Sequence, residues 1–196
     1  MILGTVLVFV FAVTTFALWR EGLWATLITL VNVLLAASLA TAWHEWAAAA
    51  LQSLLPTYSF LLDFVALWAI FCGVLFLARE VTDRVSPSRV RFRKPVELFG
   101  TPLAALIVAW TLTAFTATTL HVAPVQPGMV PGESGPGLFP GTAPDRAWLA
   151  WVRGATSRPP FGRPETAFDP AGDFIARHAA RRAGLEKQQE LRVAAP

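Results

Sequence analysis

Four long apolar runs occupy the first part of the chain, at about 1–19, 23–43, 58–78 and 98–120. Each run reaches about 20 residues, the length that a helix needs to cross a bilayer. The first run has no basic start and no small-residue cleavage site, so we read it as an uncleaved span and not as a signal peptide. Because the first two runs are joined by a very short turn, the pattern predicts an all-α membrane protein with four transmembrane helices in two hairpins.

The longer polar segments between these runs are of two kinds. Residues 44–56 are amphipathic, and they either extend the second helix or lie on the membrane surface. Residues 79–97 are rich in arginine, and the first part of this segment is expected to continue the third helix until Ser86-Pro87 ends it.

The last third of the chain has a different character. Residues 121–144 are a linker rich in proline and glycine, with little to bury, and residues 145–196 are expected to form a tail with short helices. Asp145 is predicted to cap the first tail helix and Asp169 the second, with Pro170 at its first helical position. Few apolar residues are available for a separate core, so the tail is expected to dock on the membrane domain or a partner, or to stay partly mobile.

Positive charge is concentrated at two connections between the spans. Lys and Arg in short loops favour the cytoplasmic side of a membrane. With four spans, the turn at residue 20 and the 79–97 loop fall on the same side, so we expect both to be cytoplasmic. The N-terminus and the tail are then extracytoplasmic. The residues that carry this topology are Arg20, Glu21, Arg79, Arg84, Arg89, Arg91, Arg93 and Lys94.

Composition agrees with a membrane domain followed by a water-facing tail. The chain of 196 residues is 55% hydrophobic and 15% charged, and its mean hydropathy is +0.52. The topology loop explains the net charge of +3 and the pI near 9.7, so no nucleic-acid partner is expected. The single cysteine, Cys72, excludes an internal disulfide framework and a cysteine-based metal cluster.

Two polar residues inside the predicted spans are candidate functional residues. Asn32 lies in the middle of the second span, where an amide either packs between helices or lines a pathway. Asp63 is the one acidic residue inside a span, and its carboxylate is either a structural anchor near the interface or part of an ion or proton pathway.

Three further residues, His44, Glu45 and His121, are predicted at the outer interface, which makes a metal site conceivable. The HExxH pattern of zinc proteases fails, because Ala48 stands at the position of its second histidine. The sequence also lacks a phosphate loop, a nucleophile elbow and a pair of membrane aspartates. We therefore expect no enzymatic activity, no cofactor and no metal.

Two short segments beside the spans carry a family resemblance. The first is the turn Trp19-Arg20-Glu21-Gly22-Leu23, and the second is the entry to the fourth run, Val96-Glu97-Leu98-Phe99-Gly100. With the four-span pattern and the basic loop, residues 1–120 resemble the CvpA family, the colicin V production proteins of bacterial inner membranes. Glu97 and Gly100 hold places similar to the family's helix entry, whereas Thr101-Pro102 occupies its second glycine-type position.

The resemblance implies a non-enzymatic, multi-pass inner-membrane protein that supports toxin production or export and envelope homeostasis. Membrane lipids are expected partners, together with further copies of the chain or another membrane protein. The alternative is a small oligomeric channel or transporter with Asn32 and Asp63 near its pathway. Two tail segments resemble extensions of planctomycete-type members: Asp145-Arg146-Ala147-Trp148-Leu149 and Phe168-Asp169-Pro170-Ala171-Gly172-Asp173-Phe174.

Overall fold

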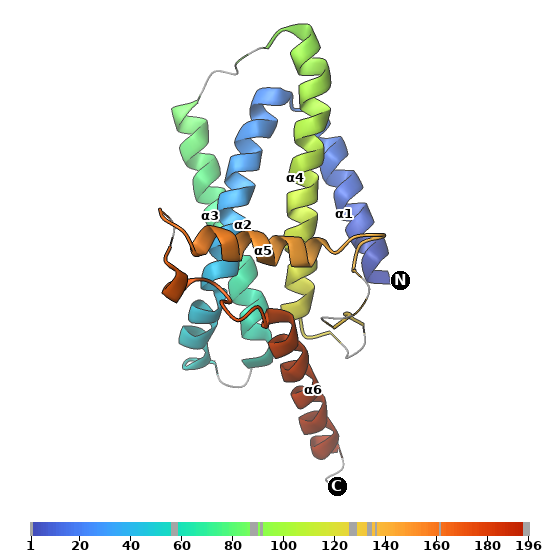
Figure 1. Ribbon diagram of the computed structural model, residues 1–196, viewed down its shortest axis with the longest axis vertical. Coiled ribbons are helices and arrows are strands. Elements are labelled where there is room, and N and C mark those ends of the chain that lie inside the picture. The colour runs from blue at the N-terminus through green and yellow to red at the C-terminus, as the bar shows by residue number, and fades with distance from the viewer. Residues whose placement is uncertain are drawn as a thin grey trace.

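The computed structural model describes residues 2–55, 59–86, 90, 92–125, 129–132, 135, 137–160 and 162–193, with side chains omitted at 59–60 and 185–193. In chain order, the helices are α1 (Ile2–Trp19), α2 (Leu23–Gln52), α3 (Ser59–Val85), α4 (Lys94–Val122), α5 (Pro144–Thr156), the 3-10 turn η2 (Pro164–Thr166) and α6 (Phe174–Val193) (Figure 1). No strand occurs among the described residues, which hold one isolated bridge between Phe139 and Thr142. Four of the helices, α1 to α4, are long and apolar enough to cross a membrane, so the predicted all-α class and four spans are confirmed.

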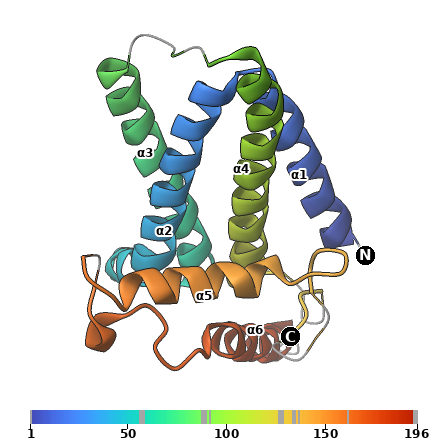
Figure 2. The ribbon, with the colours of Figure 1, turned by 45° about the horizontal axis from the view of Figure 1, so that its top comes forward.

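The four long helices run alternately up and down, with α4 between α1 and α2 (Figure 2). Helix α2 packs against α3 and α4, and α1 packs mainly against α4, so the two helices of the first hairpin diverge from their short turn. We call the end that holds the α1–α2 turn and the α3–α4 connection the loop end. The opposite end, where α5 and α6 lie, is the tail end.

Small side chains allow the long helices to approach closely. Half of the apolar stretch of α4 is buried inside the protein, compared with 11% for α1, so α4 is central and α1 peripheral. Alanines dominate the contact surfaces, since close helix packing in a membrane depends on small residues. The buried ones are Ala36, Ala37, Ala40 and Ala48 of α2, Ala66 of α3, and Ala104, Ala105, Ala109, Ala114 and Ala117 of α4.

Phe115 of α4 is fully buried and connects three helices through its ring. The ring stacks on Phe71 of α3 with centroids 4.6 Å apart. It also meets Trp68 of α3 and Trp148 of α5 edge to face, at 5.7 and 6.2 Å. Aromatic pairs of this kind contribute about 0.5–1.5 kcal/mol each beyond their buried area.

The tail folds onto the membrane domain, as one of the sequence-based alternatives predicts. Helix α5 lies across α2 and α4 at the tail end (Figure 2). Its residues Trp148, Leu149 and Val152 are buried in the same apolar cluster as Phe115. The indole Nε1 of Trp148 donates a hydrogen bond to Thr41 Oγ1 of α2 at 3.0 Å, which fixes the height at which α5 crosses.

The spans are longer than their apolar runs. Helix α2 continues through residues 44–52, which the sequence left open between a helix extension and a surface segment. Helix α3 continues past residue 78 to Val85, and α4 begins at Lys94, four residues before the apolar run. These additions are polar or amphipathic, so hydropathy alone does not mark them as parts of spans.

The predicted starts of both tail helices are wrong. Asp145 does not cap α5, because the helix begins at Pro144 after Ala143, and the Asp145 carboxylate is turned to His121. Asp169 does not precede a helix directly either, since α6 begins at Phe174. Asp169 has a φ of +46°, a conformation that Asp tolerates better than most residues, and the chain turns there before it enters α6.

The linker also buries more than its composition predicts. Val130 and Leu138 have relative exposures of 6% and 7%, and they pack with Leu7 of α1 and Ala117 of α4. The two apolar side chains are separated by proline and glycine and lack periodicity, which is why no pattern in the sequence marks them.

The residues that carry the family resemblance meet at the loop end. Glu97 Oε1 accepts the backbone N–H of Leu23 at 3.1 Å, and Glu97 Oε2 accepts that of Phe92 at 3.3 Å. A Cβ atom at Gly100 would lie 2.8 Å from Leu23 Cδ2, so α4 approaches the turn closely and a side chain at Gly100 would require Leu23 to shift. We call Gly22, Leu23, Glu97 and Gly100 the loop-end junction.

Gly22 generates the first prediction. It has a φ of +87° and a ψ of 162°, a region open essentially to glycine alone, and a Cβ there would lie 3.0 Å from Glu97 Oε1. We expect Gly22→Ala to lower the free energy of unfolding by about 1–3 kcal/mol, measured by unfolding in mixed detergent micelles. Gly73→Ala is the matched control, since a Cβ there meets no atom within 4 Å. An equal loss in both variants would contradict this account of the turn.

Candidate functional site

Charged and imidazole side chains gather where α6 meets the ends of α2 and α3. They come from α2, from the start of α3, from the turn before α6 and from α6 itself. We call this set the tail-end polar cluster, and its members are His44, Glu45, Asp63, Asp169, Arg177, His178 and Arg181.

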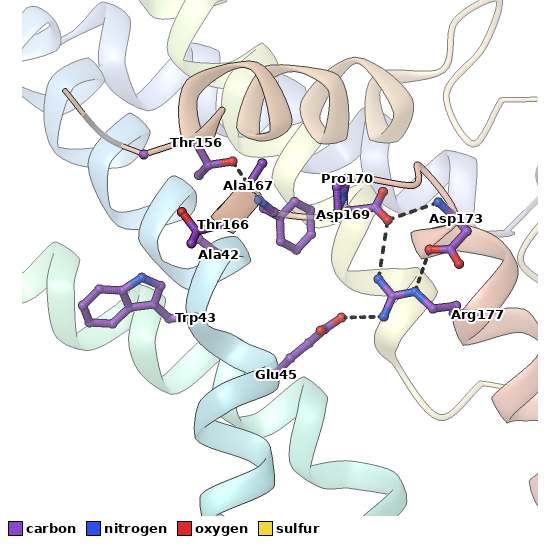
Figure 3. Close-up of a pocket in the computed structure, with 12 residues that line it drawn as sticks. Ala42, Trp43, Glu45, Thr156, Thr166, Ala167, Asp169, Pro170, Asp173 and Arg177 are labelled. Atoms are coloured by element: carbon purple, nitrogen blue, oxygen red, sulfur yellow. Dashed lines mark hydrogen bonds and ion pairs between the residues drawn. The ribbon is translucent and has the colours of Figure 1, made fainter. Parts of the chain in front are cut away.

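Arg177 links three acidic residues (Figure 3). Its guanidinium donates to Glu45 Oε1 of α2 at 3.2 Å, to Asp173 Oδ1 at 2.8 Å and to Asp169 Oδ1 at 3.5 Å. Burial lowers the pKa of Arg177, but the charge of Glu45 and the bond to Asp173 outweigh it, so the pKa is raised and the charge is retained. This residue therefore ties α6 to α2 and to the turn that precedes α6.

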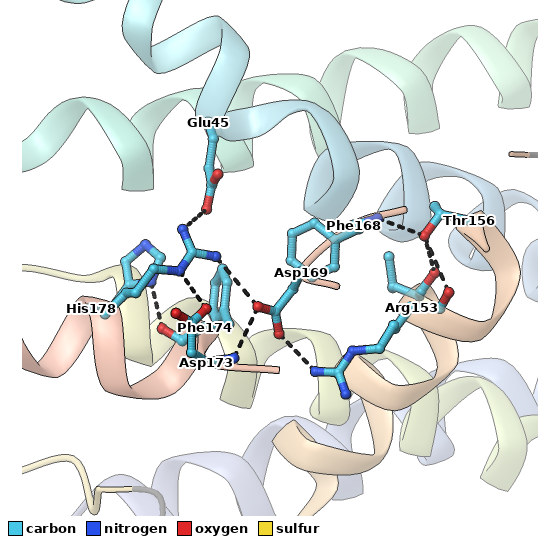
Figure 4. A network of polar contacts seen from close by, with 10 residues as sticks. Glu45, Arg153, Thr156, Phe168, Asp169, Asp173, Phe174 and His178 are labelled. Atoms are coloured by element: carbon cyan, nitrogen blue, oxygen red, sulfur yellow. Dashed lines mark hydrogen bonds and ion pairs between the residues drawn. The ribbon is translucent and has the colours of Figure 1, made fainter. Parts of the chain in front are cut away.

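Asp169 is the most buried carboxylate of the cluster, with a side-chain exposure of 1%. Arg153 of α5 donates to its Oδ2 at 2.7 Å, and the backbone N–H of Asp173 donates to its Oδ1 at 3.1 Å (Figure 4). Burial raises the pKa of this carboxyl, but the hydrogen bond and charge of Arg153 outweigh burial and lower it. Asp169 therefore joins α5 to α6 as an ionised group.

Asp63, the acidic residue predicted inside the third span, pairs with Arg181 of α6. Its side chain is 11% exposed, and that of Arg181 is 47% exposed. Arg182 donates to the backbone carbonyl of His121 at the end of α4. Whether Asp63 is a structural anchor or part of an ion pathway, its partner is Arg181 of the tail. No pattern in the sequence connects these two residues.

His44 and His178 face each other with ring centroids 6.4 Å apart. The Nδ1 atoms of both rings lie 2.9 Å from a backbone carbonyl, that of Thr41 for His44 and that of Phe174 for His178, so each Nδ1 is a donor. His44 is fully buried, and its Nε2 finds no hydrogen-bond partner among the residues that the structure describes. Burial lowers the pKa of His178 and outweighs its bond to the Phe174 carbonyl, so this ring is neutral at neutral pH.

Two open cavities flank the Glu45–Arg177 ion pair, which lines both. The larger, of about 570 Å³, lies between α2 and the segment before α6 (Figure 3). The smaller, of about 330 Å³, reaches Asp63, His178 and Arg181. The cluster is therefore accessible to small solutes even though His44 is enclosed.

The third histidine, His121, lies in a different contact. Its Nε2 is 2.8 Å from Asp145 Oδ2, and both side chains are less than 5% exposed. Burial raises the pKa of Asp145, but the bond and charge of His121 outweigh burial and lower it. The other ring nitrogen is buried and has no hydrogen-bond partner within the described part of the chain, and the pair ties α4 to α5.

Asn32 is remote from the tail-end polar cluster. It is 3% exposed and donates from Nδ2 to Thr82 Oγ1 of α3 at 3.2 Å. Thr82 is 19 residues from Asp63 in the same helix, which is about 28 Å at the helical rise. The structure therefore does not bring Asn32 and Asp63 together.

The predicted topology residues lie at the loop end. Arg79 pairs with Asp83, and Arg84 with Glu80, both across one exposed helical turn of α3. Glu21 is exposed in the α1–α2 turn, and Arg20 lies 5.0 Å from the centroid of the Phe16 ring. Arg93 and Lys94 are exposed at the start of α4, while Arg89 and Arg91 fall outside the described residues.

The sequence analysis missed Arg153, Arg177, His178 and Arg181 as site residues. Neither these arginines nor His178 match a known site motif, and they lie in a helix with few apolar residues. Their spacing does carry a signal: Phe174, Arg177, His178 and Arg181 follow each other at intervals of three, one and three, so they share one face of α6. A face that alternates aromatic and basic residues predicts a partner surface with acidic groups.

Asp169 generates a prediction about docking of the tail. We expect Asp169→Asn to weaken the packing of α6 by about 1–3 kcal/mol, since a buried acceptor of charged hydrogen bonds is lost. Faster hydrogen exchange in α5 and α6, with unchanged exchange in α1, is the measurement. Asp173→Asn is the matched control, because its side chain is 49% exposed. Equal acceleration in the two variants would contradict the role of Asp169.

The lowered pKa values of Asp145 and Asp169 predict how docking responds to acid. Folding lowers the pKa of both carboxyls. Each therefore stabilises the fold fully at pH values above its pKa in the unfolded chain, which is about 3.9. This stabilisation is lost as the pH falls through the pKa of the folded state. We expect the tail to stay docked at pH 5 and to be released in stronger acid, followed by Trp fluorescence. Release that begins near pH 6 would contradict this assignment.

Comparison of the chain with protein-family models, with curated proteins and with solved structures found no match. The resemblance to the CvpA family stays a prediction from the sequence. The structure adds one observation to it: the glycines and the glutamate of the two resembling segments pack together in the loop-end junction.

Proposed function

We propose that this chain is a non-enzymatic, CvpA-type protein of the bacterial inner membrane that supports toxin production or export and envelope homeostasis through protein partners. The observation that supports it most directly is the loop-end junction. Residues from two segments that resemble the family meet there, and Glu97 receives hydrogen bonds from both the turn and the α3–α4 connection. A shared packing arrangement explains why those residue types occur together.

The orientation is part of the proposal. Exposed arginines and Lys94 gather at the loop end, and such residues favour the cytoplasmic side. The tail, with its polar cluster and cavities, is then extracytoplasmic. There it forms a folded cap that is joined to the spans by ion pairs and a common apolar core, and in this position it can meet envelope or exported proteins.

Transport is the second candidate function. Asn32 and Asp63, the two residues that it would use, allow the two candidates to be distinguished. Asn32 and Asp63 sit in separate contacts about 28 Å apart along α3, which favours a packing role for Asn32 over a shared pathway. A transporter that uses both residues would need a continuous polar route between them.

The experiment is complementation of a bacterial strain that lacks its own CvpA-type protein. We expect the chain to restore export of colicin V and growth under envelope stress. Glu97→Ala is expected to lose at least half of this activity at normal membrane levels, because two backbone donors lose their acceptor. Glu21→Ala, in the exposed α1–α2 turn beside the Glu97 contact, is the matched control and should complement fully.

The same assay separates the two candidates. We expect Asn32→Leu and Asp63→Asn to complement when immunoblots show normal protein levels. Loss of activity in both variants at normal levels would favour the channel or transporter instead. No restoration by the unchanged chain, once it is inserted in the membrane, would contradict the proposed function.

A further inference from the structure

His44, Glu45 and His178 have a property that the proposed function does not use. Each offers one ligand atom, and the three atoms lie within 4.8 Å of one another. Both imidazoles donate from Nδ1 to a backbone carbonyl, which fixes the tautomer and leaves Nε2 with a free electron pair. The Nε2 atom of His44 is fully buried and has no partner in the described ranges of the chain, an arrangement that costs free energy unless something else binds there.

We propose that His44, Glu45 and His178 form a binding site for a divalent transition-metal ion such as Zn²⁺, with a solvent molecule or Asp63 as the fourth ligand. Two neutral imidazoles and a carboxylate are a donor set that Zn²⁺ accepts, and three protein ligands leave one position open. Metal-binding histidines usually donate their other ring N–H to a carbonyl or carboxylate, as both of these rings do.

Modest side-chain movement completes the geometry. Tetrahedral ligands about 2.1 Å from zinc lie about 3.4 Å from each other, so atoms now up to 4.8 Å apart must close by about 1.4 Å at most. Glu45 can contribute to this movement, because its side chain is 45% exposed. The smaller cavity is lined by Glu45 and His178, so an ion that enters it meets two of the three proposed ligands.

The arginines of α6 compete with the metal for the same carboxylates. Arg177 now holds Glu45, and Arg181 holds Asp63. Metal binding therefore replaces the Glu45–Arg177 ion pair by a coordinate bond, while His178 keeps α6 attached to α2. A metal ion at this site would join α2 to α6, as the Glu45–Arg177 ion pair does when no metal is bound.

The test is metal uptake by the full-length protein in lipid nanodiscs, purified with a tag free of histidine and stripped with chelator. We expect one Zn²⁺ per chain by equilibrium dialysis, and one Co²⁺ with visible absorption bands of a four- or five-coordinate site. His44→Asn and His178→Asn keep a side-chain donor near Nδ1 but remove Nε2. Each should weaken binding by at least about 100-fold, since even indirect partners of metal ligands cost 10–100-fold.

Further variants protect the test against misfolding and unspecific binding. Glu45→Gln changes an exposed residue and should also weaken binding. His121→Gln, at the histidine outside the site, is the matched control and should bind as the unchanged protein does. Arg177→Gln removes the competitor and should bind up to about fivefold more tightly.

The inference is independent of the proposed function, since uptake is measured without complementation. Absence of stoichiometric uptake by the unchanged protein would overturn it. Equal uptake by the Glu45→Gln, His178→Asn and unchanged proteins would overturn it as well, because the ion would then bind elsewhere.

Discussion

The contact of Phe115 with its three aromatic neighbours is the interaction on which the rest of the structure depends. Helices α3 and α4 otherwise touch little, and the ring of Phe115 bridges them through Phe71 and Trp68. The same ring receives Trp148, which seats α5 against the bundle. The membrane domain and the tail therefore share one apolar core, and the positions of all groups at the tail end follow from it.

Charged contacts at the tail end then select the position of α6. Packing of apolar surface is not directional, whereas ion pairs and hydrogen bonds require defined geometry. Arg153, Asp169 and Arg177 form a chain of such contacts from α5 through the turn to α6, and Arg177 continues it to Glu45 of α2. Arg153, Arg177 and Glu45 are partly exposed, so each ion pair contributes only modestly to stability. The main effect of this series of contacts is to fix the orientation of α6.

Periodicity and hydropathy suffice to predict the four spans, because lipid imposes length and apolar composition on each helix separately. The two tail helices were also foreseen, but their starts were not, because capping depends on where the side chain finds a partner. Asp145 bonds to His121, 24 residues away, and Asp169 to Arg153, 16 residues away. Likewise, no local pattern connects His44 with His178, which only the docking of α6 brings together.

The length of α2 has a consequence for the tail-end polar cluster. At 30 residues the helix extends about 45 Å, about 15 Å more than the hydrocarbon thickness of a bilayer. The apolar run ends at Trp43, so His44 and Glu45 stand at the start of the projecting part. When the apolar run of α2 fills the hydrocarbon layer, Glu45 stands at its boundary, at the edge of the region across which the membrane voltage falls. A charge that binds to or leaves Glu45 then moves through little of that voltage, so its occupancy follows the composition of the adjoining solution more than the energised state of the membrane.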